Sequence, residues 1–215
     1  MKSLILSLSI AVAAPLLAVT PLAAQAQQAA ATPGQQVVAN GGRILSTLQQ
    51  RRAEFRKSPA ALRNFIDTEL RGSFDSMYAA RLVLGAHGRG ASEADIKLFA
   101  DAMVDNLMQR YGTALLDFEG KPRLRLKGET PLPGGRGVKV STELLRDNGA
   151  PVPVDYLVRN NGGWKIFDVM IEGVSYVQTF RGQFDSPLRQ KGIAQVAADL
   201  RSGSLKTTTA GNGSR

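Results

Sequence analysis

The chain has 215 residues, no cysteine and only one histidine. The lack of cysteine excludes a disulfide, so no covalent cross-link holds this fold together. The sequence also contains no G-x-S-x-G, H-E-x-x-H, P-loop or dinucleotide-binding motif, so the usual arrangements for nucleophilic, metal-dependent and phosphate-transfer catalysis are missing. The single histidine, His87, lies in a glycine-rich break, and we interpret it as a surface or hinge residue rather than a general base.

Long apolar stretches are scarce too, and the one present lies at the N-terminus. Lys2 forms a short basic start, residues 4–19 are apolar apart from Ser and one Pro, and residues 24–26 read Ala-Gln-Ala, which is typical of a cleavage site. We therefore predict a secretory signal peptide over residues 1–26. The run is too short and too rich in Ser and Ala for a membrane span, and we expect a soluble, exported protein, which in a bacterial envelope means the periplasm.

Acidic residues are outnumbered by basic ones. The 27 Lys and Arg against 18 Asp and Glu give a formal charge of +9, which falls to +8 when Lys2 is removed with the signal peptide. Such a balance favours anionic partners. Because an exported protein meets little nucleic acid, we expect lipid phosphate, an anionic membrane surface or an acidic protein patch, and no nucleic acid.

The remainder predicts one α+β domain over residues 35–201, preceded by an Ala/Gln-rich linker at 27–34. Residues 202–215 have too little apolar content to fold and are predicted to be a disordered tail. The first half is helical in spacing. The predicted helices there span residues 37–56, 59–70, 74–84 and 92–118.

Helix starts are marked by capping residues. Ser58 and Pro59 form an N-cap followed by proline at the first helical position, and Ser92 with Asp95 resembles a capping box. The C-terminal part returns to helical spacing after a third such start at Ser175. Ser186 and Pro187 restart or kink that helix, Gly192 ends it, and a last helix spans residues 193–200.

Three strands lie between the helical regions, over residues 137–145, 152–159 and 164–171. The turn sequences RDNGAP and NNGG join them, which predicts an antiparallel sheet, and a weaker strand at 123–127 is expected at its edge. The third strand is apolar on both faces. Its period of two places Lys165, Phe167, Val169 and Ile171 on one face and Trp164, Ile166, Asp168 and Met170 on the other.

An interior ligand would explain this surplus of apolar surface, although an ordinary core has the same composition. An enzyme is the alternative, with Asp168 tuned by burial on its apolar strand. The ordinary interpretation of Asp168 is a carboxylate paired with a nearby arginine. A third possibility is an adaptor that only bridges envelope proteins.

Four segments resemble, in order and spacing, the MlaC-type periplasmic phospholipid-binding proteins of the Mla lipid transport system, also called toluene-tolerance or Ttg2-type proteins. The segments are FDSMYAARLVLG, ASEADIKLFADAMVDNLMQRYGTAL, WKIFDVMIEGVSYVQTFRGQF and LRQKGIAQVAADL. The likeness runs from Pro33 to Arg201. Its most specific parts are residues 82–85, 91–92 and 172–175 together with Asp168.

The resemblance implies a curved antiparallel sheet of about four strands, wrapped by several helices around an apolar lipid cavity. It implies a monomeric, non-enzymatic shuttle that carries glycerophospholipids between the outer and inner membranes and maintains outer-membrane lipid asymmetry. No cofactor is implied, because the phospholipid is cargo. The implied partners are an outer-membrane lipoprotein complex of the MlaA-porin type and an inner-membrane ABC transporter with an MCE-domain subunit of the MlaD type.

Periodicity and resemblance together place a set of apolar residues near this cavity. The candidates for lipid contact are Phe74, Met77, Phe99, Met103, Leu107, Tyr111, Val140, Val154, Tyr156, Trp164, Val169 and Ile171. No catalytic residue and no metal ligand is predicted.

Overall fold

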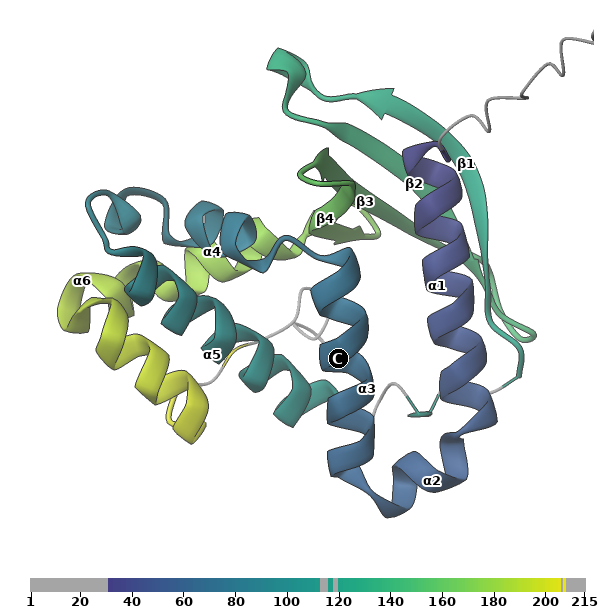
Figure 1. The fold of residues 1–215 in the computed structure, drawn as a ribbon, viewed down its shortest axis with the longest axis horizontal. Coiled ribbons are helices and arrows are strands. Elements are labelled where there is room, and N and C mark those ends of the chain that lie inside the picture. Colours follow the sequence, from purple (N-terminus) through teal and green to yellow (C-terminus); the bar gives the residue numbers. More distant parts are fainter. Residues whose placement is uncertain (1–30, 113–115, 118–119, 206, 208–215) are drawn as a thin grey trace, which may run out of the picture. The chain divides into compact units, whose positions relative to one another are not determined.

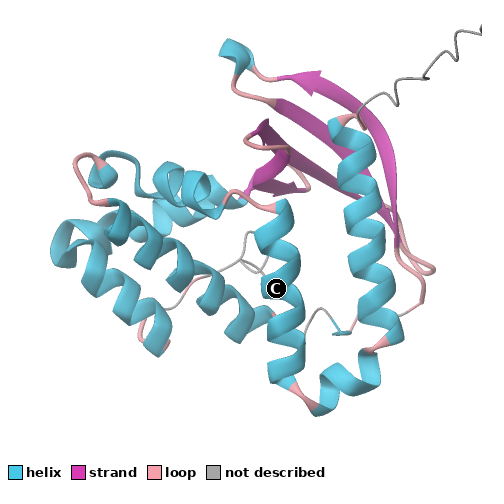
Figure 2. Ribbon diagram, viewed as in Figure 1, coloured by secondary structure: helices cyan, strands magenta, loops and turns pink. Residues whose placement is uncertain are grey.

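The structure is a computed structural model that describes residues 31–112, 116–117, 120–205 and 207, except for the side chains of Arg110 and Tyr111. It confirms the α+β class: the described residues form six α-helices and an open five-stranded antiparallel sheet in the order β1-β2-β3-β4-β5 (Figure 1). Figure 2 shows the strands gathered in one sheet and the helices grouped beside it. In these described residues, no helix combines the length and the apolar character that crossing a membrane requires.

The first three helices are α1 (Pro33–Gln50), α2 (Arg52–Lys57) and α3 (Pro59–Ser73). The sequence predicted a single helix over 37–56, and the structure corrects this at both ends. Thr32 caps α1 in a full capping box with Gln35, so the helix starts earlier and includes part of the predicted linker. The break comes at Arg51, whose guanidinium bonds Glu54 and lies 4.6 Å from the ring centroid of Phe55. The predicted start at Ser58 is confirmed.

The start of α1 is attached to a distant strand. The hydroxyl of Thr32 and the backbone N–H of Gly34 both donate to Oε1 of Glu129, at 2.7 and 2.9 Å. A Cβ on Gly34 would lie 2.5 Å from that oxygen and 2.8 Å from a methyl carbon of Leu126. A larger residue at this position would displace the ends of the Glu129 and Leu126 side chains, so glycine favours this close approach of helix and strand.

A second group of helices comprises α4 (Ser76–Leu84), the short 3-10 turn η1 (Gly85–Gly88), α5 (Glu93–Tyr111) and α6 (Tyr176–Ser202). Helix α4 begins two residues later than predicted, because the Asp75 side chain caps it and Phe74 stays extended and bridges β4 at Ile166. Ser92 caps α5 as predicted, and this helix ends at Tyr111 rather than at 118. Gly192 breaks α6 with φ of 72°, as expected from the sequence.

The helices α4, α5 and α6 share the largest core cluster. Phe99 and Phe184 meet edge to face with ring centroids 5.6 Å apart, and Phe180 stacks on Phe184 at 5.8 Å. Two smaller clusters complete the interior: one lies among α1, α2 and α3, and the other joins Val37 of α1 to Val140 and Val158 of the sheet. Helix α1 thus covers part of one face of the sheet (Figure 1).

The sheet consists of β1 (Arg123–Pro131), β2 (Val138–Leu145), β3 (Val152–Asn160), β4 (Trp164–Ile171) and β5 (Val174–Ser175). The weak edge strand is confirmed and continues to Pro131. The number of strands is five rather than about four, because β5 has only two residues. A strand that short has no periodicity by which a sequence could reveal it.

A bulge in β4 overturns the predicted alternation of its faces. Leu157 and Val158 are neighbours in β3, yet their partners Asp168 and Ile166 are separated by Phe167, which is the extra residue. Cross-strand partners share a face of the sheet. The residues of β4 that pair with the alternating set Asn160, Val158, Tyr156 and Val154 are Trp164, Ile166, Val169 and Ile171. Those four therefore lie on one face. An uninterrupted period of two would instead place Trp164 and Ile166 on one face and Val169 and Ile171 on the other.

The segment predicted as a disordered tail begins within ordered structure. Leu205 packs against the core cluster of α4, α5 and α6, and its N–H donates to the carbonyl of Asp199 at 3.1 Å. Thr207 is buried and its hydroxyl donates to Oδ1 of Asn106 at 2.7 Å. The prediction missed these anchors because the stretch has few apolar residues. Residues 206 and 208–215 lie outside the described part of the chain, as does the predicted signal peptide.

Candidate functional site

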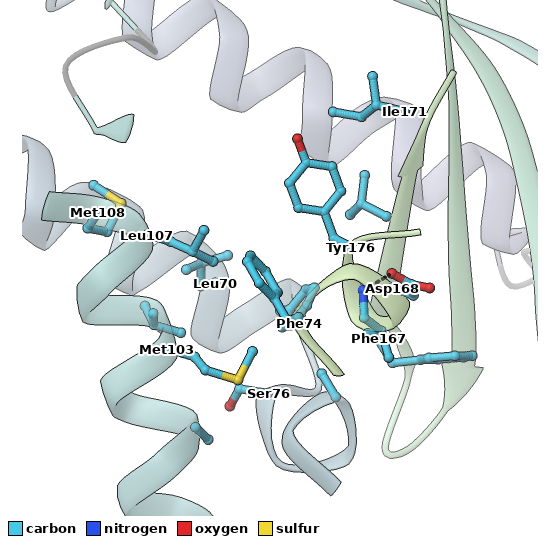
Figure 3. A pocket seen from close by; sticks show the side chains of 16 residues that line it. Leu70, Phe74, Ser76, Met103, Leu107, Met108, Phe167, Asp168, Ile171 and Tyr176 are labelled. Carbon is cyan, nitrogen blue, oxygen red and sulfur yellow. Dashed lines mark hydrogen bonds between the residues drawn. The ribbon is translucent and has the colours of Figure 1, made fainter. Parts of the chain in front are cut away.

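An apolar cavity of about 340 Å³ lies among α3, α4, α5, α6 and β4 (Figure 3). Among the residues that line it, Ser76, Asp168 and Tyr176 carry polar side-chain atoms, and the rest are aliphatic, aromatic or methionine. The lining residues are Leu70, Phe74, Ser76, Ala79, Ala100, Met103, Val104, Leu107, Met108, Phe167, Asp168, Val169, Ile171, Tyr176, Val177 and Phe180. Such a lining is suited to a hydrocarbon ligand, and it has few hydrogen-bonding groups that could orient a polar molecule.

Helix α5 supplies the longest stretch of this wall. Its lining residues follow helical spacing and form one stripe: Ala100, Met103, Val104, Leu107 and Met108. The neighbouring stripe faces the core, where Ile96, Phe99 and Ala102 are fully buried. One amphipathic helix thus divides its apolar surface between a packed core and an open space.

Strand β4 forms the opposite wall, and its bulge increases the contribution. Phe167, Asp168, Val169 and Ile171 all line the cavity, whereas a regular strand would present alternate residues only. Phe167 also packs against Tyr78, whose ring meets it edge to face with the ring centroids 5.1 Å apart. Trp164 and Ile166, at the other end of the strand, pack with α1 instead. The doubly apolar character of β4 therefore serves both a core and a cavity wall.

Asp168 is the charged residue of the wall, and its carboxylate is fully engaged. It is 5% exposed; Oδ2 accepts from the Ser175 hydroxyl at 2.6 Å and Oδ1 from the N–H of Val177 at 3.0 Å. Burial raises the pKa of Asp168, while these bonds and the backbone N–H groups of Val169 and Tyr176 work against the rise. The structure corrects the predicted arginine partner, because the donors to Asp168 are the Ser175 hydroxyl and backbone N–H groups.

The structure divides the twelve predicted lipid-contact residues into three groups. Those that line the cavity are Phe74, Met103, Leu107, Val169 and Ile171. Those that lie elsewhere are Met77 and Phe99, in or against the helical core, Val140, Tyr156 and Trp164, in or against the cluster around Val37, and Val154, which is buried in the sheet. The side chain of Tyr111 lies outside the described residues.

The six predicted residues that lie outside the cavity were misplaced for one physical reason. A fully packed position and a cavity-lining position both need an apolar side chain, so periodicity cannot separate them. Tyr156 is partly buried against the cluster around Val37, and burial raises the pKa of its hydroxyl to about 12.

Sequence reasoning missed several lining residues, notably Leu70, Tyr176 and Phe180. Met108 was obtainable, because it continues the helical stripe of Met103 and Leu107. Tyr176 and Phe180 follow the Ser175 cap at the start of α6, and only the tertiary structure shows that this helix end turns toward β4.

No metal centre emerges from the described part of the chain, which holds no group of three or more His, Asp or Glu residues able to bind an ion. His87 lies away from the cavity, with Nε2 at 2.9 Å from Oδ1 of Asp185. This pair joins η1 to α6 and has the form of a structural contact.

Comparison with known proteins decides the family. The family model described as MlaC protein matches residues 39–202, which is most of the chain. The chain belongs to the MlaC family. This confirms the resemblance found in the sequence.

Two curated relatives of the MlaC family are similar over most of their length. The toluene tolerance protein ttg2D of Pseudomonas putida is 27% identical over 183 residues, which cover 82% of this chain and 81% of the relative. The intermembrane phospholipid transport system binding protein MlaC of Haemophilus influenzae is 22% identical over 163 residues, covering 74% of this chain and 76% of the relative.

A solved structure confirms the fold. It is the phospholipid-binding protein from Ralstonia solanacearum in complex with a phospholipid, with a TM-score of 0.71 and 19% sequence identity. The match covers 82% of this chain and 100% of the solved chain. The α+β arrangement of this MlaC family member is therefore shared with a protein whose fold accommodates a lipid.

Proposed function

We propose that this protein binds a glycerophospholipid by its acyl chains in the apolar cavity and carries it across the periplasm between the two membranes. The observation that supports this most is the cavity itself, whose wall is apolar apart from three residues. The similarity to an intermembrane phospholipid transport binding protein and to a solved phospholipid-binding protein supports the same proposal.

An empty space of this kind would be costly. Protein interiors are packed as densely as organic crystals and contain few voids larger than a water molecule. A cavity of about 340 Å³ whose lining has polar side-chain atoms only on Ser76, Asp168 and Tyr176 offers few partners for water. A hydrocarbon ligand restores the missing dispersion contacts, so the cavity is best understood as the space for a lipid tail.

The proposed cargo explains why a carrier is needed. The two acyl chains of a phospholipid contain roughly thirty methylene groups, and at ~0.8 kcal/mol for each the gross cost of their exposure to water is on the order of 20 kcal/mol. Free transfer through an aqueous compartment is therefore negligible. Because tight binding slows release, delivery requires partners that open the cavity or offer a competing apolar site.

We propose the following cellular setting. The predicted signal peptide directs the protein to the periplasm, where it works as a monomer without a cofactor. It exchanges lipid with an outer-membrane lipoprotein complex of the MlaA-porin type and an inner-membrane ABC transporter with an MlaD-type MCE-domain subunit, and so maintains lipid asymmetry. The basic surface, with a formal charge of +9 for the whole chain, steers docking to acidic partner surfaces.

The enzyme alternative depends on Asp168, and the geometry does not favour it. Hydrogen bonds donated to a carboxylate hold it in place and lower its basicity, which makes it a poorer general base. Both oxygens of Asp168 already accept hydrogen bonds from Ser175 and Val177. The carboxylate thus has a structural role at the start of α6, which supports a carrier rather than an enzyme.

The direct test is extraction of the folded, purified protein into organic solvent, followed by mass spectrometry. A protein of similar charge serves as the control for adsorbed lipid. We expect about one phospholipid per chain. The Met103→Glu variant should lose it, since a carboxylate is costly to bury in an apolar cavity. Ala94→Glu, at an exposed position of the same helix, is the matched control. An intact wild-type fold without lipid would refute the proposal.

A further inference from the structure

A second, polar pocket adjoins the apolar cavity. It has a volume of about 320 Å³, and Leu70, Phe74, Ser76 and Val104 line both spaces. Its other lining residues are charged: Asp67 and Arg71 from α3, Lys97, Asp101 and Asp105 from α5, and Arg201 from α6. A molecule with an apolar tail in the cavity and a polar end would have its polar end here.

The charges of this pocket balance, with three basic and three acidic side chains. That is unusual for this protein, in which 27 basic residues face 18 acidic ones. A pocket built to select an anionic head group would share the basic excess of the chain. A balanced pocket is complementary to a ligand that carries both signs of charge.

Most of these charges already have partners. Lys97 lies 2.7 Å from Oδ2 of Asp101, and Asp105 pairs with Arg63 through one oxygen and with Arg201, at 3.5 Å, through the other. The second carboxylate oxygen of Asp101 accepts no hydrogen bond from another described residue. Arg71, in contrast, has no ion pair or side-chain hydrogen bond with any other residue that the structure describes.

Asp67 is the second unengaged charge, and no other described residue pairs or hydrogen-bonds with its side chain. It precedes Arg71 by four positions on α3, so the two side chains are neighbours on one face of the helix. An unpaired guanidinium and an unpaired carboxylate therefore lie side by side at the boundary with the apolar cavity. The first suits a phosphate and the second suits an ammonium group.

We propose that the polar pocket binds the head group of the lipid and selects a zwitterionic one with a primary ammonium, such as phosphoethanolamine. In this arrangement Arg71 contacts the phosphate, while Asp67 and the remaining oxygen of Asp101 accept hydrogen bonds from the ammonium. A quaternary ammonium cannot donate such bonds, and a glycerol head group leaves the carboxylates facing an anion. This inference rests on the proposed function, because it assumes acyl chains in the adjoining cavity.

The test is a competition between two lipids with identical acyl chains. Delipidated protein is incubated with an equimolar mixture of phosphatidylethanolamine and phosphatidylglycerol in detergent micelles, recovered, and extracted for mass spectrometry. We expect the wild type to hold the ethanolamine lipid in about fivefold excess, the discrimination that one exposed charge pair provides. Asp67→Asn should bring the ratio close to one with little loss of total lipid. Arg71→Gln should lower the amount of both lipids about fivefold, because both have the phosphate.

Matched controls use the same substitutions outside the pocket. Asp117→Asn alters a carboxylate that is 73% exposed, and Arg123→Gln alters an exposed residue of β1; neither should change the ratio or the amount of lipid. If the wild type holds both lipids equally, or if Asp67→Asn behaves like Asp117→Asn, the head-group assignment is wrong while the carrier function stands. If the wild type holds no lipid of either kind, the proposed function itself fails.

Discussion

The two apolar stripes of α5 differ in how closely they are packed, although Met103 and Leu107 of the second stripe also contact the core cluster. Toward the core, Ile96 and Phe99 are fully buried, and Phe99 meets the ring of Phe184. Toward β4, Met103 and Leu107 line a cavity of about 340 Å³. The first stripe is fully buried among other side chains, whereas the second borders an open space. If the proposed function is right, that space holds the ligand.

The largest expected effect tests this difference directly. Phe99→Ala should lower the free energy of unfolding by about 3–5 kcal/mol, because it leaves a void in a fully packed cluster. Met103→Ala should cost about 1 kcal/mol in delipidated protein, since its side chain already borders open space. Urea denaturation of both variants measures the two values. Equal losses would mean that the two stripes are packed alike.

A smaller effect on stability is expected from a substitution of Asp168 in the cavity wall. Asp168→Asn replaces one of the two acceptor oxygens with an NH2 group, which would face either the Ser175 hydroxyl or the Val177 N–H. We expect a loss of about 1–3 kcal/mol in unfolding free energy, the usual cost of leaving a buried group unsatisfied. Urea denaturation gives this value, and extraction of the same variant reports its lipid. An unchanged stability would contradict the structural role of Asp168.

The smallest effect concerns pH. Burial raises the pKa of Asp168, so the folded state holds this proton more tightly than the unfolded state does. Its contribution to stability should therefore be greatest in acid and decline as pH rises from the ordinary Asp value of about 3.9 through the raised value. Denaturation at a series of pH values should show this slope in the wild type and lose it in Asp168→Asn. A wild-type stability that rises relative to the variant over that range would reverse the sign.

Much of the fold followed from local patterns in the sequence. The caps at Ser58 and Ser92, the break at Gly192 and the three main strands all depend on neighbours along the chain, and the structure confirms them. The capping box at Thr32 is equally local and was overlooked. Patterns of this kind are readable because capping and turn formation need only a few adjacent residues.

The candidate site was predicted less well, since it depends on contacts between distant segments. The bulge at Phe167 moves Val169 and Ile171 to the face of Trp164, and no local signal in an apolar strand marks such an extra residue. Phe99 and Met103 are one helical turn apart and both apolar, yet Phe99 is fully buried while Met103 also borders the cavity. Only the positions of α6 and β4 decide which is which.

The contact of Thr32 and Gly34 with Glu129 has a consequence for the order in which the protein folds. These partners are 97 and 95 residues apart, and Val37 packs against strands that lie further along the chain. A polypeptide that emerges N-terminus first therefore produces α1 long before its docking surface exists. Closing so long a loop is slow, because its entropy is lost before the contacts form. Helix α1 can therefore complete its contacts with the sheet only after β1, β2 and β3 are available.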